Sequence, residues 1–137
     1  MNEQEFKERT KRVGLEVIRL IEGLPKGHTA DVLGRQLLRS ATSIGANYRA
    51  ACRGKSGADV INKLGNVEEE ADETLYWMEL LTEASLIPGK KLEQIRSDVN
   101  EVLAMTVASI KTLRLRASLR GPESKIQNPK SKIRNGN

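Results

Sequence analysis

The chain has 137 residues, of which 38% are hydrophobic and 30% are charged, and its net charge is +5. This balance is typical of one helical domain and excludes a chain too polar to build a core. Because only 3% of the residues are aromatic, the core must be aliphatic.

The sequence shows neither an apolar membrane or signal segment nor a pair of cysteines. No apolar run reaches the roughly 18 residues that a membrane span needs, and residues 1–12 contain no apolar signal-peptide segment. Cys52 is the only cysteine, so an intrachain disulfide is excluded. We therefore expect a cytoplasmic protein without membrane contact.

The first half of the chain carries two stretches with apolar residues at three- and four-residue spacing, which predicts two helices. The first covers residues 3–23 and ends at a loop containing Gly23, Pro25, Gly27 and His28. The second covers residues 29–53, with Thr29 as N-cap and a C-cap glycine at Gly54. Their core stripes are Phe6, Val13, Val17, Leu20, Ile21 and Leu24, and Leu33, Leu37, Ala41, Ile44, Tyr48 and Ala51.

The second half repeats the pattern twice. A third helix is predicted over residues 56–85, with Ser56 as N-cap, and a fourth over residues 90–119, after Pro88 and Gly89. Their stripes are Val60, Leu64, Val67, Ala71, Leu75, Met78 and Leu81, and Leu92, Ile95, Val99, Leu103, Thr106, Ile110 and Leu113. Short turns between long helices predict an all-α, antiparallel up-down-up-down four-helix bundle over residues 1–119.

Residues 120–137 differ in kind from the rest. They contain Glu123 as their single acidic residue against five basic ones: Arg120, Lys125, Lys130, Lys132 and Arg134. Apolar residues are too few for independent folding, which predicts a disordered basic low-complexity tail. The tail either has no specific role or acts as a basic arm for nucleic acid.

Four arginines of the second predicted helix share the face opposite its core stripe: Arg35, Arg39, Arg49 and Arg53. Lys55 follows them in the next turn. Guanidinium groups in such a row suit phosphate, so we interpret these five residues as a candidate nucleic-acid-binding surface. The same row could instead be a solvated face, or pair with glutamates of a neighbouring helix or subunit.

Two further surfaces are candidates for an interface. Ser43 and Asn47 belong to a small polar stripe, with Gln36 and Ser40, that suits close helix packing or a ligand site. On the third helix Trp77 and Leu80 lie outside the main stripe, which suits either a subunit contact or burial within the protomer. The acidic residues near them, Glu69, Glu70 and Glu73, could pair with the arginines within one chain or between subunits.

Catalytic constellations are not found in the sequence. Its single histidine, His28, has no glutamate at the Glu-x-x-His spacing of di-metal bundles, and Glu69 with Glu73 is too weak a ligand set. Cys52 lacks a neighbouring base. We therefore expect no enzymatic activity, no cofactor and no metal site.

Two segments carry a resemblance to a known family. They are QLLRSATSIGANYR at residues 36–49, followed by RGKS at residues 53–56, and EEADETLYWMELL at residues 69–81. Over about residues 6–113 the chain resembles the bacterial 23S ribosomal RNA intervening-sequence proteins, although many members have Glu where this chain has Ala50. The resemblance implies a four-helix bundle that forms a homopentamer, and kinship with the accessory protein of diversity-generating retroelements, which binds a reverse transcriptase and nucleic acid.

Two functional hypotheses follow. In the first, the protein is a homo-oligomeric, pentameric accessory protein that binds RNA or DNA. Its further partner would be a reverse transcriptase or another protein. In the second, it is an assembly scaffold whose Arg and Glu faces form the subunit contacts. The resemblance places Arg39, Ser43, Asn47, Glu70 and Glu73 first among the residues to test.

Overall fold

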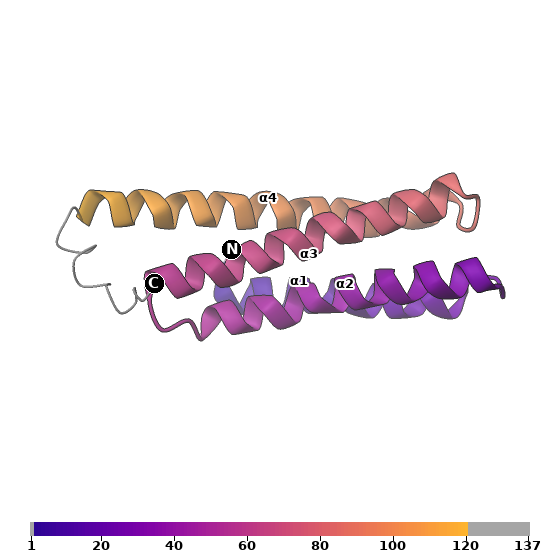
Figure 1. Cartoon of the computed structure of the whole chain (residues 1–137), viewed down its shortest axis with the longest axis horizontal. Helices are drawn as coiled ribbons and strands as arrows, with labels where there is room; N and C mark the ends of the chain where they lie inside the picture. The colour runs from indigo at the N-terminus through magenta and orange to yellow at the C-terminus, as the bar shows by residue number, and fades with distance from the viewer. Residues whose placement is uncertain (1, 121–137) are drawn as a thin grey trace.

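The structure is a computed structural model, and it describes residues 2–120. Helices α1 (Glu3–Glu22), α2 (His28–Cys52), α3 (Gly57–Glu83) and α4 (Gly89–Arg120) follow one another without a strand in this part of the chain. They alternate in direction, with the α1–α2 hairpin lying against the α3–α4 hairpin (Figure 1). The predicted all-α four-helix bundle is confirmed.

The packing around the bundle is uneven. The α2–α3 interface is the most extensive, and each helix also packs on its neighbour in sequence, whereas α1 and α4 make the smallest contact. The two hairpins are therefore joined mainly through their inner helices.

Local capping signals decide where the helices begin. At α1 the backbone N–H of Glu5 donates to the Asn2 side chain (2.8 Å), and the Asn2 N–H donates to the Glu5 carboxylate (3.0 Å), which is a capping box. At α3 the predicted N-cap is confirmed, because the Ser56 hydroxyl accepts from the N–H of Asp59 (3.1 Å). These two caps satisfy N–H groups that have no partner inside the helix.

The predicted start of the second helix is wrong. The N-cap residue is Gly27 and not Thr29, and no side chain caps this end. Gly27 has a φ of 155°, a conformation open to glycine, which lets the chain enter the helix earlier. His28 is consequently the first residue of α2 and not part of the preceding loop.

Two helix ends also differ from expectation. Arg53 is the C-cap of α2, and Gly54 does not adopt the positive φ of a C-cap glycine. Glycine is needed at 54 for space, because a Cβ there would lie 2.4 Å from Cγ2 of Val60. Helix α4 includes Arg120, which the sequence predicted to be the first residue of the tail. The predicted disorder of the tail beyond it concerns residues 121–137, which lie outside the described part.

The core is aliphatic, as the composition predicted. Most stripe residues are buried, and Val13, Leu37, Val67, Met78 and Val99 have no exposed surface. Full burial of such a side chain stabilises the fold by about 1.5–3 kcal/mol. The remaining fully buried aliphatic side chains are Val17, Ala41, Ile44, Ala71, Leu81, Leu92 and Val102.

Four buried polar side chains complete the core: Thr10, Ser40, Thr74 and Thr106. Each hydroxyl lies against a carbonyl of the preceding turn; Thr106, for example, bonds to the Val102 oxygen at 2.7 Å. Their burial costs little because these hydrogen bonds satisfy the hydroxyl groups.

Within residues 2–120, no helix combines the length and the apolar character required to traverse a bilayer.

Candidate nucleic-acid interface

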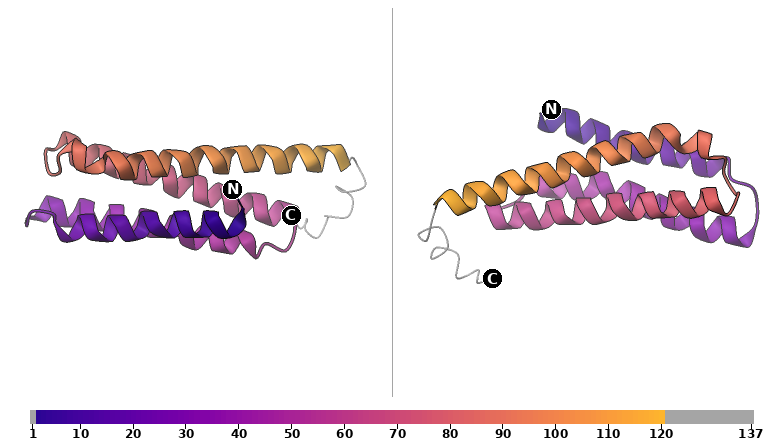
Figure 2. Two further views of the ribbon diagram at one scale, coloured as in Figure 1. Left: turned by 180° about the vertical axis from the view of Figure 1, so that it is seen from behind. Right: turned by 90° about the horizontal axis from the view of Figure 1, so that it is seen from above.

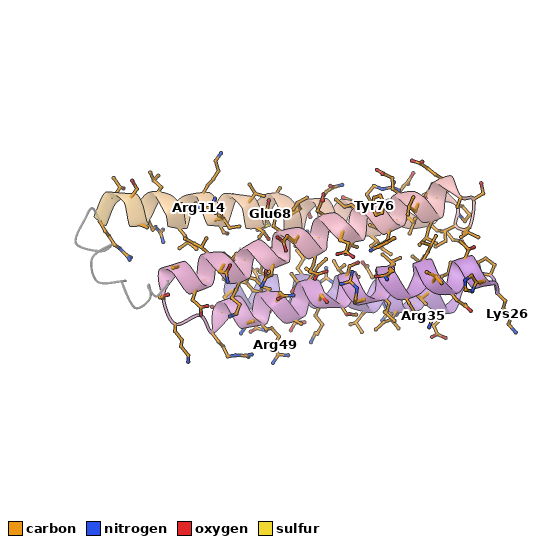
Figure 3. The ribbon with its side chains drawn as sticks, in the orientation of Figure 1. Lys26, Arg35, Arg49, Glu68, Tyr76 and Arg114 are labelled. Carbon is orange, nitrogen blue, oxygen red and sulfur yellow. The ribbon has the colours of Figure 1, made fainter. Side chains whose placement is uncertain are left out.

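The arginine row of α2 lies on the outside of the bundle, as its spacing predicted. Arg35, Arg39, Arg49 and Arg53 are exposed, and so is Lys55 in the turn that follows. Figure 3 shows Arg35 and Arg49 on the side of α2 that faces away from α3 and α4. The structure therefore keeps the row on one face, opposite the buried stripe of Leu37 and Ile44.

Arg39 differs from the other arginines because it is paired within the chain. Its guanidinium donates to the carboxylates of Glu70 (3.3 Å) and Glu73 on α3, while its Nε donates to Gln36 (3.2 Å). Trp77 donates its indole N–H to the same Glu73 carboxylate (3.0 Å). We call Gln36, Arg39, Glu70, Glu73 and Trp77 the Arg39 network. It joins α2 to α3 inside one protomer.

The Arg39 network includes three of the residues predicted as interface candidates. Glu70, Glu73 and Trp77 were candidates for a subunit contact, yet all three are half-buried and hydrogen-bonded to residues of their own chain. Trp77 also packs edge-to-face against Tyr76, with ring centroids 5.1 Å apart. Their contacts in this structure are intramolecular, and they hold the α2–α3 interface together.

The other interface candidates form no hydrogen bonds or salt bridges to another helix in the described part of the chain. The Ser43 hydroxyl donates to the Arg39 carbonyl (2.7 Å), and the Asn47 amide donates to the Ser43 carbonyl (2.9 Å), both inside α2. Leu80 is half-buried, and Glu69 is exposed without a salt bridge to any residue of the described part. Of the small polar stripe, Ser40 alone contacts α3, through the Thr74 hydroxyl (2.9 Å).

Basic residues gather at the end of the bundle where α2 turns into α3. Helix α4 finishes at this end, and Glu101 is its last acidic residue. Arg49 and Arg114 both lie toward this end (Figure 3). We call the following seven exposed residues the basic end: Arg49, Arg53, Lys55, Lys111, Arg114, Arg116 and Arg120.

The side chains of the basic end are not held in ion pairs within the described residues. None of its seven side chains makes a salt bridge with another residue of the described range 2–120. Sequence reasoning assigned Arg49, Arg53 and Lys55 to the arginine surface and Arg120 to the basic tail, and it missed Lys111, Arg114 and Arg116 on α4. The sequence did contain a signal, since no Asp or Glu occurs between Glu101 and Arg120. The basic residues of this stretch can be grouped with those of α2 only once the fold shows that they lie at the same end of the bundle.

Two grooves run along the bundle surface. One lies between α1 and α2, has a volume of about 530 Å³, and is walled by the exposed side chains of Leu15 and Ile18 with Arg49 at its edge. The other lies at the basic end between α2, α3 and α4, has a volume of about 590 Å³, and includes Cys52 and Arg116 in its walls.

A pair of acidic residues lies in the thin contact between α1 and α4. Glu16 Oε1 is buried and has no hydrogen-bond partner among the described residues. Burial raises the pKa of Glu16, the negative charge and hydrogen-bonding carboxylate of Asp98 raise it further, and the nearby Arg12 and Arg19 oppose the shift. Asp98 accepts from the Gln94 amide (3.1 Å).

The comparisons with known proteins agree with this fold. No curated protein matches the chain. A solved structure of a protein of unknown function from the S23 ribosomal protein family of Bacteroides thetaiotaomicron VPI-5482 is similar, with 36% identity and a TM-score of 0.75, over 81% of this chain and 99% of that one. Residues 2–108 match the family described as 23S rRNA-intervening sequence protein. The resemblance seen in the sequence is thus confirmed, and the chain belongs to the 23S rRNA-intervening sequence protein family.

Proposed function

We propose that the protein is a non-enzymatic, homo-oligomeric accessory protein of the cytoplasm that binds nucleic acid, RNA in particular, through the basic end. The single observation that carries this proposal is the cluster of seven exposed cationic side chains that form no salt bridge within the described residues. A nucleic acid would supply the missing negative charge, and release of its counterions would drive binding.

The proposed surface differs from the arginine row in two ways. Arg39 is left out, because Glu70 and Glu73 already neutralise its guanidinium. The α4 residues Lys111, Arg114, Arg116 and Arg120 are added, because α4 passes the last turn of α2 across the groove that contains Cys52 and Arg116 and continues beyond it (Figure 1). Contacts from arginine would be directed at phosphate oxygens in bidentate geometry.

Binding at the basic end should show little sequence preference. Base stacking needs exposed aromatic rings, but Tyr48, the aromatic residue nearest this end, is half-buried and packs edge-to-face against Phe6 (4.5 Å between centroids). Phosphate contacts position a protein on nucleic acid without reading its bases. We therefore propose recognition of backbone charge and shape.

Self-association is the second part of the proposal. Leu15 is 44% exposed and Ile18 42% exposed on α1, and Val32 is 40% exposed on α2. These side chains wall or adjoin the α1–α2 groove, and their burial between copies would favour a homo-oligomer, for which the family resemblance suggests a pentamer. As an alternative function, an assembly scaffold would use this apolar face, since the Arg39 network is satisfied within one chain.

Salt-dependent binding to labelled RNA and DNA tests the nucleic-acid proposal. Full-length wild type is compared with Arg53→Ala/Arg114→Ala at the basic end and with Lys26→Ala/Arg35→Ala at the other end. Both double variants lose the same charge and keep residues 120–137, so only position differs. We expect the first variant to reduce the slope of log K against log salt by about two, at ~0.9 per phosphate contact, and the control to leave it unchanged.

Two results would contradict the proposal. The first is the absence of binding by wild type to either nucleic acid at low salt, which leaves the scaffold alternative. Equal losses in the two double variants would show that net charge alone, without a localised surface, determines binding. Light scattering on the same samples tests self-association, and a mass equal to one chain would reject the homo-oligomer.

A further inference from the structure

The groove at the basic end exists because α1 stops short of the other helices. α1 has 20 residues and α4 has 32, which correspond to about 30 Å and 48 Å of helix. The capping box of Asn2 and Glu5 starts α1 at Glu3, beside Tyr48 and Phe6. Figure 2 shows α4 continuing well past the first turn of α1. Near the basic end α4 therefore faces α2 and α3 across the groove without a fourth helix, and its residues 114–120 are all exposed.

The floor of this groove is apolar. Ala51, Leu64 and Ile110 form a small separate cluster of buried residues, with Val60 and Leu113 packed against it. The groove above it has a volume of about 590 Å³ and is walled on the α4 side by Met105, Ala108 and Thr112.

The apolar surface continues along α4 beyond the groove. Leu115 is 61% exposed and Leu119 is 79% exposed. They follow Thr112 by three and seven residues, a spacing that keeps them on the same side of the helix. Large exposed leucines that extend an apolar groove suit contact with a partner.

We propose that this groove, which we call the end groove, binds an amphipathic helix of another protein, with leucine-like residues on one face and acidic residues on the other. Helices α2, α3 and α4 leave an apolar groove where α1 does not reach, which suits a helix-in-groove contact. The charges select the polar face of the occupant: Arg116 lies in the groove wall, and Arg120 follows it by four residues on the same side of α4. Glu3 is the one acidic residue in the wall.

Two other occupants fit the chemistry less well. Residues 121–137 contain four basic residues and a single acidic one, so this segment offers almost no acidic side chains to pair with Arg116. A phosphate backbone would leave the walls of Met105, Leu64 and Val60 uncovered, and its charges would gain nothing from an apolar floor. The end groove thus goes beyond the nucleic-acid surface proposed above, although the two share basic residues.

Cys52 offers a direct measure of occupancy, because it is the only cysteine and it lies in the groove wall. The probe is a synthetic helical peptide of about 18 residues, with Leu at positions spaced three and four apart and Glu on the opposite face. A second peptide has Lys in place of every Glu. We expect the acidic peptide to slow alkylation of Cys52 in the full-length protein by about tenfold or more at saturation, and the Lys peptide to have no such effect at the same concentration.

Ala108→Trp fills the groove with a large ring and should weaken the acidic peptide by about tenfold or more. Ala104→Trp is the matched control: Ala104 is exposed one turn earlier on α4 and lies in a different surface hollow, with Glu101 and Asn100. This variant should bind the peptide like wild type. Circular dichroism of both variants confirms that the bundle is intact.

Three results would overturn the proposal. The first is equal binding of the peptide to the two Trp variants, and the second is equal binding of the acidic and basic peptides. The third is a Cys52 that is already protected in wild type without peptide and becomes reactive on dilution as the mass falls, because a second copy would then occupy the groove. RNA binding by Ala108→Trp separates the two proposals, since it is expected to persist when peptide binding is lost.

Discussion

Glu73 of α3 holds the guanidinium of Arg39 and, through the same carboxylate oxygen, the indole N–H of Trp77. The Glu73 side chain thus links Arg39 of α2 to Trp77, which lies one turn after Glu73 on α3. Arg39 is 47% exposed, and contacts of this kind at a surface contribute about 0.2–1 kcal/mol each.

Arg39→Ala should therefore lower the free energy of unfolding by about 1 kcal/mol, and Glu73→Gln by a similar amount. The double variant should lose less than the sum, because both changes break the same contact. Urea unfolding of the four proteins measures this coupling. Arg35→Ala, which loses an exposed arginine of the same helix, is the control and should change stability little. Additive losses would show that Arg39 and Glu73 do not act together.

The buried hydroxyls of Ser40 and Thr74 form the one hydrogen bond between helix interiors that we find in residues 2–120. Thr74→Val keeps the shape of the side chain but leaves Ser40 with one fewer partner, and it should cost about 1–2 kcal/mol. Adding Ser40→Ala should cost less than it does in wild type. Denaturant curves check this, and a full additive loss from the second substitution would contradict it.

Glu16 makes stability depend on pH in an unusual direction for a carboxyl group. Since its pKa in the fold lies above the ordinary 4.5, the protonated form is favoured by folding, and this contribution is complete at low pH and is lost as pH rises through the folded-state pKa. Glu16→Gln stays neutral at every pH. It should be more stable than wild type at pH 7, and the difference should vanish below about pH 4.5.

Unfolding midpoints measured from pH 4 to pH 8 in ~1-unit steps test this expectation. Glu22→Gln, an exposed position on the same helix, is the matched control and should show no comparable change with pH. A Glu16→Gln protein that is less stable than wild type at pH 7 would show that the ionised carboxylate is favoured there.

Gly54→Ala should destabilise the protein by about 1–3 kcal/mol, because its Cβ would overlap Cγ2 of Val60. The backbone at Gly54 does not need a positive φ, so the cost is one of space. Val60→Ala in the same chain should recover part of the loss. If the second substitution recovers none, the overlap with Val60 is not the cause.

The sequence was sufficient for the bundle because each helix carries its own apolar stripe, from Val13 and Val17 to Val99 and Ile110. It was sufficient for the start of α3, since Ser56 is a local capping signal. The start of α2 was misplaced because Thr29 looks like a cap, whereas the backbone conformation of Gly27 is not visible in a residue pattern.

The candidate surface was only partly predictable. Periodicity placed the arginines on one face of α2 but could not tell that α3 brings Glu70 and Glu73 to Arg39 alone. Lys111 and Arg114 were not recognised because their importance depends on where α4 ends relative to α2. Such relationships between distant segments arise from packing, and helical spacing within one segment does not contain them.

Because the contact between α1 and α4 is small, the bundle should open most easily between these two helices. Separating these outer helices breaks the Arg9–Glu101 pair and exposes Glu16, while the extensive α2–α3 interface with its Ser40–Thr74 bond stays closed. Regions with fewer buried contacts open at lower free energy. Backbone amides of α2 and α3 should accordingly exchange with deuterium last. The α2–α3 interface would then hold the two hairpins together while the outer helices separate.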